Sequence, residues 1–274
     1  MITICLLILF IITIMSYKNI SFQTKDNTAI IYLNRPEVLN SFNYAMADDF
    51  LDALTVCKVN KEIRALLITG EGRAFCAGQD LEEATKKNGP SIDKIIEHTY
   101  NPITLAITKL NKPVICCVNG VAAGAGANLA IACDITFACK SAKFIQSFIN
   151  IGLVPDTGGS YFLPRLIGKQ KAAGLMFGGD KITAEQAESL GMIYKAIDDE
   201  KAFEASLDFA NRLSKMPTKS IGLIKDLLRN SLTNNLEQQL DLEKKHQIIA
   251  ANSDDHKEGI NAFFEKRKPN YKGN

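Results

Sequence analysis

A loop built of small residues joins two apolar segments near the middle of the chain. It spans residues 119–126, reads NGVAAGAG and contains Gly120, Gly124 and Gly126. Backbone without bulky side chains lets a ligand approach main-chain N–H groups closely. A helix-like segment follows from about Asn128, and N–H groups at the start of a helix are unpaired and favour negative charge. The loop is therefore suited to hold an oxyanion, a phosphate, or a carbonyl oxygen that becomes negative during a reaction.

Two other interpretations of this loop are open. Gly and Ala also serve tight packing of a helix against a strand. A dinucleotide-binding motif fits less well, because Leu129 stands where the third glycine is required and no clear acidic residue follows at the right distance. A second glycine-rich stretch at residues 66–81, LLITGEGRAFCAGQDL, favours a binding role, since it joins a short apolar strand to another small-residue turn at Ala77 and Gly78.

Several separate motifs, in matching order and spacing over residues 15–268, resemble the enoyl-CoA hydratase/isomerase (crotonase) superfamily. They are Asn34-Arg35-Pro36, Leu39-Asn40-Ser41, Phe75-Cys76-Ala77-Gly78-Gln79-Asp80, Pro113-Val114, Asn119-Gly120-Val121-Ala122, Asp134 and Gly152-Leu153-Val154-Pro155-Asp156-Thr157-Gly158-Gly159. The resemblance implies a spiral of ββα units followed by C-terminal helices that assemble trimers, which commonly pair as hexamers. It is closest to the branch that isomerises a ring epoxide during phenylacetate breakdown.

Composition is typical of a globular cytoplasmic protein. The chain has 274 residues, of which 46% are apolar, enough for one large domain with or without an appendage. The net charge of +2 gives no sign of nucleic-acid binding. The 7 cysteines lack a CxxC spacing and lie mostly in apolar runs, which indicates buried reduced thiols. Metal binding is not expected, because the 3 histidines are not clustered.

The N-terminus is an apolar, uncharged run, MITICLLILFIITIM, over residues 1–15. It is shorter than the roughly 20 residues of a membrane-spanning helix. It also lacks the basic start and the small-residue cleavage site of a secretory signal. Met15 stands where family members usually begin, so we expect translation to start there and residues 1–14 to be an upstream extension. A membrane anchor is the alternative interpretation.

Alternating strand and helix patterns predict an α/β core over residues 15–200 and a charged helical region over residues 201–274. A capping box at residues 183–186 begins a short helix, and Gly191 ends it. A polar loop at residues 82–91 is expected to be mobile. Strands are predicted at residues 29–33, 65–69, 114–118, 135–138 and 142–144, and helices at 45–57, 92–110, 220–232 and 235–250.

The resemblance implies a thioester carbonyl bound by two backbone N–H groups, those of Gln79 and Ala125. Such donors stabilise an enolate oxygen by roughly 3–4 kcal/mol each. Ordinary turn residues are the alternative. The resemblance also places coenzyme A against Ala77, Phe263 and Lys266, where a solvated basic tail is the alternative. Coenzyme A is then part of the substrate, and no separate cofactor is expected.

The acid/base groups decide the reaction. Hydratases of the superfamily activate water with two glutamates. The corresponding positions here are Asn128 and Phe148, so efficient water addition is not expected. Asp156 is a carboxylate that isomerase branches place against the substrate, and an apolar pocket lined by Phe148 and Ile149 should raise its pKa. A helix N-cap is the alternative role for Asp156.

Five other polar residues are expected to be structural or solvated: Asp80, Asp134, His98, His246 and His256. We predict an acyl-CoA isomerase that converts a ring 1,2-epoxide of phenylacetyl-CoA into oxepin-CoA, with a shift of a 3-enoyl bond to the 2-position as a second activity. An enoyl-CoA hydratase is the first alternative. A catalytically silent acyl-CoA-binding or RNA-binding member is the second, although near-neutral charge argues against RNA.

Overall fold

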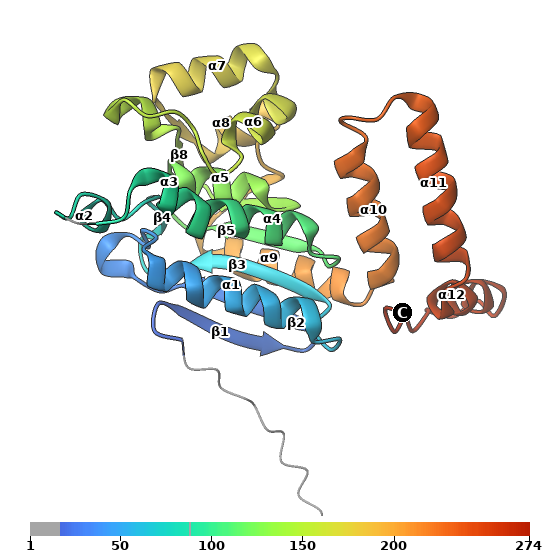
Figure 1. Cartoon of the computed structure of the whole chain (residues 1–274). Helices are drawn as coiled ribbons and strands as arrows, with labels where there is room; N and C mark the ends of the chain where they lie inside the picture. Colours follow the sequence, from blue (N-terminus) through green and yellow to red (C-terminus); the bar gives the residue numbers. More distant parts are fainter. Residues whose placement is uncertain (1–16, 88) are drawn as a thin grey trace, which may run out of the picture.

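The computed structural model describes residues 17–87 and 89–274, so the predicted start at Met15 and the apolar run before it lie outside the described residues. Two sheets form the centre of the molecule (Figure 1). Among residues 17–87 and 89–274, none of the helices combines the length and the apolar character needed to span a bilayer.

The larger sheet has six strands, and most of them run parallel. β1 and β2 form an antiparallel hairpin, whereas the later strands pair in parallel. β3 and β5 are buried along their whole length, as is typical of parallel strands covered on both faces. In order across the sheet, the strands are β1 (Ile20–Lys25), β2 (Thr28–Leu33), β3 (Ala65–Gly70), β5 (Val114–Val118), β7 (Ile135–Cys139) and β10 (Lys195–Ile197).

The smaller sheet has four strands of three residues each. They are β4 (Ala74–Cys76), β6 (Val121–Ala123), β8 (Lys143–Ile145) and β9 (Lys181–Thr183). A strand of the large sheet, a strand of the small sheet and a helical segment follow one another three times along the chain, beginning at β3, β5 and β7. This repetition confirms the predicted spiral of ββα units.

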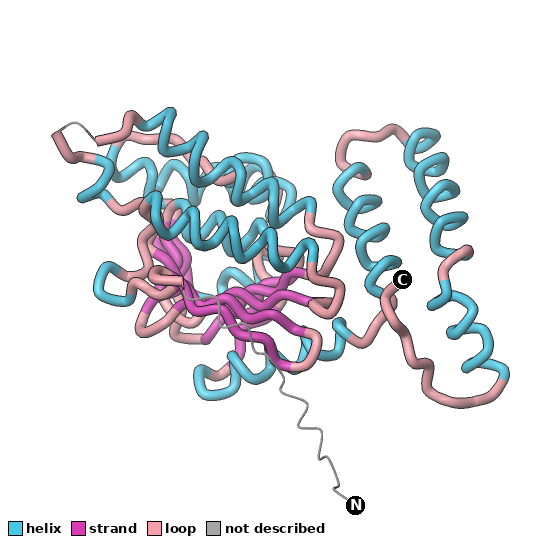
Figure 2. Tube along the Cα trace, turned by 60° about the horizontal axis from the view of Figure 1, so that its bottom comes forward, coloured by secondary structure: helices cyan, strands magenta, loops and turns pink. Residues whose placement is uncertain are grey.

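Helices lie on both sides of the strands (Figure 2). α1 (Tyr44–Val59) buries an apolar stripe that includes Met46, Phe50 and Leu54. α9 (Asp199–Ser214) packs against β3, β5 and β7. The division at residues 200 and 201 stays a prediction, although α9 contributes Ala202 and Leu207 to the same core as the sheet. α6 (Gly159–Ile167), α7 (Lys169–Gly178) and α8 (Ala184–Leu190) complete this part of the molecule, and Thr183 and Gly191 cap α8 as predicted.

The segment predicted as one helix over residues 92–110 has a π-helical turn in its middle. α3 (Ile92–Ile95) leads into the π-turn η2 (Ile96–Tyr100), and α4 (Asn101–Lys109) follows. Pro102 explains the interruption, because proline has no N–H for the bond to the preceding turn. The predicted mobile loop is also partly helical, since the Asp80 carboxylate caps a short helix, α2 (Leu81–Ala84).

The C-terminal helices form a hairpin that projects from the sheets (Figure 1). α10 (Thr218–Asn230) and α11 (Leu236–Ala251) match the two predicted helices, and α12 (Asp254–Phe264) follows. Within the described part of the chain, α11 has no buried residue. The predicted assembly into trimers or hexamers stays a prediction.

Lys225 of α10 ties the hairpin to the core. Its Nζ forms an ion pair with Asp134, whose carboxylate also accepts from the Val114 N–H at 2.7 Å. The same ammonium donates to the Lys112 carbonyl at 2.9 Å. These contacts confirm the prediction that Asp134 is structural.

The Lys225→Met variant should lose about 2 kcal/mol of unfolding free energy, because it leaves the Asp134 carboxylate without its cation. This loss of unfolding free energy should be smaller than for a fully buried ion pair, because the Asp134 side chain is 28% exposed. Urea denaturation measures it. Lys219→Met, at an exposed position of the same helix, is the control. Equal stability of the two variants would contradict this role of Lys225.

Candidate active site

The first predicted oxyanion donor lies in a turn after β4. Gly78 adopts a φ of +94°, which favours glycine. The Gly78 carbonyl accepts from Phe42 N–H at 2.8 Å, and the Asp80 N–H donates to the Phe42 carbonyl at 2.9 Å. The residues on either side of Gln79 are thus both bonded to the backbone of Phe42. Its own N–H donates to no acceptor within residues 17–87 and 89–274, so it is free for a ligand.

The second predicted donor begins a helix. α5 (Ala125–Ala132) starts three residues before the predicted position at Asn128, because Gly124 takes a φ of +53° and serves as its N-cap. The Gly124 N–H donates to the Ile145 carbonyl at 2.9 Å. The Ala125 N–H has no intrahelical partner at this position and no other acceptor in the described chain.

These two N–H groups come together because the segments that carry them are in contact. A Cβ atom at Gly78 would lie 3.0 Å from the Ala123 carbonyl oxygen and 3.4 Å from the Ala125 nitrogen. A Cβ atom at Gly126 would lie 2.2 Å from the Cys76 carbonyl oxygen. Only glycine permits this approach. The structure therefore brings the segments that carry the predicted donors into contact, which confirms the packing interpretation of the glycines. The binding interpretation stays a prediction.

Asp156 lies two residues before the N-cap of α6 and is half-buried. Burial raises the pKa of its carboxyl group, and the Thr157 hydroxyl, which donates to Oδ1 at 2.7 Å, partly offsets that rise. The alternative role as a helix cap is wrong, because Gly158 occupies the N-cap and no side chain caps this helix. The Asp156 carboxylate is therefore available for another role.

The backbone around Asp156 is strained and held by several bonds. Thr157 has a φ of +51°, an unfavourable conformation for a β-branched residue. The Asp156 carbonyl accepts from the Gly159 N–H at 2.8 Å and from Asn128 Nδ2 at 2.9 Å. Asn128 is one helical turn after Ala125, so α5 links the acid/base candidate to the predicted oxyanion donor.

The two positions of the missing hydratase glutamates are both buried. The Asn128 amide is already used in hydrogen bonds to neighbouring groups. The Phe148 ring lies beside the oxyanion loop, 3.7 Å from where a Cβ of Gly124 would be. Ile149, predicted to line the same apolar pocket, is 45% exposed.

Sequence reasoning missed Tyr100, the last residue of the π-turn. Its buried hydroxyl donates to Gln79 Oε1 at 2.9 Å. Burial, with smaller contributions from Cys76 and Asp156, raises the pKa of Tyr100 well above its usual value, so the phenol stays protonated. Tyr100 thus holds the side chain of Gln79. The only sequence signal was Pro102 inside a helical pattern.

Other predicted polar residues lie in structural or surface contacts. Asp80 forms an ion pair with Arg35 at 2.9 Å, as expected for a residue that supports the loop. His98 bonds Asp48 at 2.8 Å on the surface. The prediction that His246 is a surface residue is wrong, because its side chain is 13% exposed and bonds Asp226 between two helices. The six described cysteines are buried and free, as predicted.

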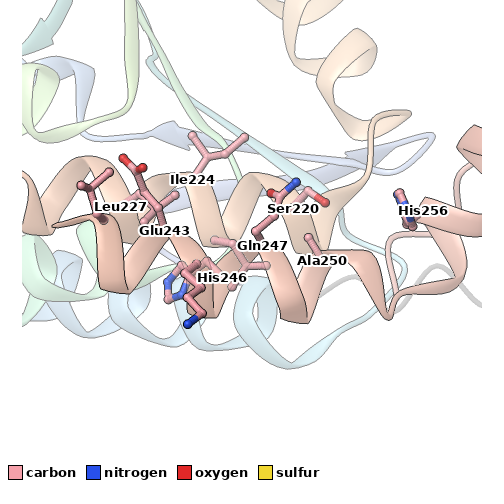
Figure 3. Close-up of a pocket in the computed structure, with 11 residues that line it drawn as sticks. Ser220, Ile224, Leu227, Glu243, His246, Gln247, Ala250 and His256 are labelled. Carbon is pink, nitrogen blue, oxygen red and sulfur yellow. The ribbon is translucent and has the colours of Figure 1, made fainter. Parts of the chain in front are cut away.

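A groove between α10 and α11 is separate from this site (Figure 3). It runs along the hairpin, on elements that carry none of the predicted catalytic residues. His246 lies in its wall, and the exposed His256 lies at one end. The residues that line it are Ser220, Leu223, Ile224, Leu227, Leu240, Glu243, Lys244, His246, Gln247, Ala250 and His256.

One chain does not bring the three predicted coenzyme A contacts together. Ala77 adjoins the Gly78 turn, and its N–H donates to the Leu39 carbonyl at 3.0 Å. Phe263, 78% exposed, and Lys266 are at the end of α12, far from β4 (Figure 1). These contacts stay predictions that require a neighbouring subunit. No cluster of three His, Cys, Asp or Glu residues that could hold a metal occurs in residues 17–87 and 89–274.

Comparison with known proteins agrees with this geometry. The enoyl-CoA hydratase/isomerase family model matches residues 23–274. The 1,2-epoxyphenylacetyl-CoA isomerase of Escherichia coli K12 is 46% identical over 88% of this chain and 93% of its own. A Rhodobacter capsulatus protein named "Probable enoyl-CoA hydratase" is 40% identical over 94% of this chain and 100% of its own. The crystal structure of an enoyl-CoA hydratase from Polaromonas sp. JS666 superposes with a TM-score of 0.85 at 34% identity, over 92% of this chain and 99% of the other.

The fold is that of the crotonases. The chain belongs to the enoyl-CoA hydratase/isomerase family.

The Gly126→Ala variant should unfold more easily by about 1–3 kcal/mol, because its methyl group would overlap the Cys76 carbonyl. Catalysis should fall too, since the overlap pushes the two loops apart. Gly174→Ala in α7 is a matched control, because no atom lies within 4 Å of its added methyl group and alanine favours a helix by about 1 kcal/mol. Thermal unfolding compares them. Equal melting temperatures for the two variants would contradict the close contact.

Proposed function

We propose that the protein is an acyl-CoA isomerase with 2-(1,2-epoxy-1,2-dihydrophenyl)acetyl-CoA as substrate and oxepin-CoA as product. One observation carries this proposal: the half-buried carboxylate of Asp156 is bonded through its backbone to α5, whose first N–H is a predicted oxyanion donor. The E. coli relative that is named for this activity supports the choice of substrate. A shift of a 3-enoyl bond to the 2-position uses the same groups and is the second proposed activity.

In the proposed mechanism, the thioester oxygen accepts hydrogen bonds from the N–H groups of Gln79 and Ala125. The Asp156 carboxylate removes a proton from the carbon beside the thioester, and the electron pair moves onto that oxygen as an enolate. The two amides stabilise this charge by roughly 3–4 kcal/mol each. For the epoxide substrate, the C–C bond between the two epoxide carbons breaks, which expands the ring to the seven-membered oxepin, and Asp156 returns the proton to a ring carbon. For a 3-enoyl substrate, Asp156 returns the proton to the far carbon of the original double bond. Substrate and product are isomers, so no other reactant is consumed.

The raised pKa of Asp156 suits this role. A carboxyl group with a higher pKa is a stronger base and still ionises near neutral pH. Burial of the side chain supplies the rise. The buried ring of Phe148, beside the oxyanion loop, keeps water away from the enolate oxygen.

The Asn128 and Phe148 positions argue against the hydratase alternative. A hydratase activates water with a carboxylate at each of these two positions. In this chain Asn128 instead donates to the Asp156 carbonyl, and Phe148 has no polar group. The Rhodobacter relative keeps hydration open as an activity to be measured. For a silent RNA-binding protein, the net charge of +2 offers little attraction to phosphate.

The Asp156→Asn variant should lower turnover of the epoxide substrate and of 3-hexenoyl-CoA by about 10²–10⁴-fold, since an amide accepts no proton. Coupled product assays measure this. Asp208→Asn, an exposed aspartate of α9, is the control and should keep full activity. Wild-type turnover in Asp156→Asn would refute the proton transfer. Rapid formation of 3-hydroxybutyryl-CoA from crotonyl-CoA, followed by proton NMR, would support the hydratase instead.

The activity should fall as pH decreases through the raised pKa of Asp156, because only the ionised carboxylate removes a proton. The Thr157 hydroxyl lowers that pKa, so Thr157→Val should move the acid limb of the kcat/KM profile to higher pH. An acid limb at the same pH in wild type and Thr157→Val would contradict the assignment of this limb to Asp156.

A further inference from the structure

We propose that Gln146 is a positioning residue for Asp156 and that it acts through the side chain of Asn128. This inference rests on the proposed function, because it assigns to Asp156 the proton transfer described above. Gln146 lies between β8 and a 3₁₀ turn, η3 (Ser147–Ile151), and no sequence motif pointed to it.

Two buried amides form a relay that ends at the backbone of Asp156. Gln146 Nε2 donates to Asn128 Oδ1 at 2.9 Å, and Asn128 Nδ2 donates to the Asp156 carbonyl at 2.9 Å. Gln146 is 3% exposed and Asn128 is fully buried. Water therefore has little access to replace either bond.

The relay has one direction. The Asp156 carbonyl is an acceptor, so Asn128 must turn its NH₂ group toward it. The oxygen of Asn128 then needs a donor on its other side, and Gln146 supplies one. In this orientation Gln146 Oε1 is buried without a partner in the described chain, an arrangement that lowers stability. The unpaired Gln146 oxygen is therefore the cost of an orientation in which the Gln146 NH₂ group donates to Asn128.

The end of β8 anchors both halves of the site. The Ile145 carbonyl accepts from the Gly124 N–H at 2.9 Å, which fixes the start of α5 and the Ala125 amide. The next residue, Gln146, fixes the Asp156 segment through Asn128. Two adjacent residues therefore set the spacing between the oxyanion donor and the acid/base group.

Close packing makes the position of Asp156 sensitive to this relay. A Cβ atom at Gly159 would lie 2.2 Å from Asn128 Nδ2, so the backbone after Asp156 rests directly on the amide. Thr157 keeps its unfavourable φ of +51° only while neighbouring bonds hold it. Loss of the donor to the Asp156 carbonyl should let this strained turn relax and move the carboxylate.

The first test is the Gln146→Glu variant, assayed on 3-hexenoyl-CoA and the epoxide. The new carboxylate cannot donate to Asn128, whose amide should rotate and present its oxygen to the Asp156 carbonyl. We expect kcat to fall about 10–100-fold, as a displacement of the reacting group by about 1 Å would cause. KM should change little, and the acid limb of the pH profile should shift. Gln170→Glu, at an exposed position of α7, is the control.

The Asn128→Asp variant tests the relay independently and serves if Gln146→Glu fails to fold. It keeps an acceptor for Gln146 but removes the donor to the Asp156 carbonyl, so it should show the same loss of kcat. Gln146→Met, which removes the hydrogen bonds at similar volume, should show an intermediate loss. Wild-type kcat and pH profile in any of these folded variants would overturn the inference.

Combination with Asp156→Asn separates this inference from the proposed function. If Gln146 acts through Asp156, then Gln146→Glu should lower kcat no further in the Asp156→Asn background. A full, multiplied loss in the double variant would overturn the inference. If Asp156→Asn alone retains wild-type turnover, the proposed function fails, whatever Gln146→Glu does.

Discussion

The contact between the first turn of α5 and the end of β4 is the constraint on which the site depends. Gly126 lets the helix lie against the Cys76 carbonyl, and Gly78 lets the neighbouring turn pass beside Ala125. The segments that carry the two unpaired N–H groups are thereby brought into contact. Any side chain at either glycine would separate them, so the small-residue composition of both loops follows from one requirement for close approach.

Around this contact, the small sheet connects groups that are distant in sequence. β4 leads to the Gln79 turn, β6 leads to α5, and β8 ends at Ile145 and Gln146, which bond the start of α5 and Asn128. Asn128 in turn bonds the Asp156 carbonyl. Tyr100 joins from the π-turn and bonds Gln79. Each ββα unit thus delivers one part of the site, and the spiral stacks these parts at one edge. The proposed acid/base group and the proposed oxyanion donors therefore share a single frame.

Sequence patterns located the strongly apolar or periodic elements and missed several others, among them the half-exposed strand β1. Apolar runs located β3 and β5, which are buried at every position, and a helical period of apolar residues located α1, which is buried along one stripe. Strands of three residues such as β9 and β10 carry no such period. The helix start at Ala125 depended on the φ of Gly124, and the amide of Gln146 found its partner only through tertiary packing. Motif resemblance, by contrast, supplied Gln79, Ala125 and Asp156 as candidates, and their roles stay predictions.

The exposed hairpin of α10 and α11 should unfold locally at a lower free energy than the sheets. In the described chain no residue of α11 is fully buried, although the His246 side chain lies against α10, whereas the sheets hold most of the apolar core. Helices that bury little apolar surface open at low free energy. Amide hydrogen exchange in an isolated chain would therefore divide into a fast population from the hairpin and a slow one from the strands. Transient melting of this arm would leave the frame that carries Asp156 intact.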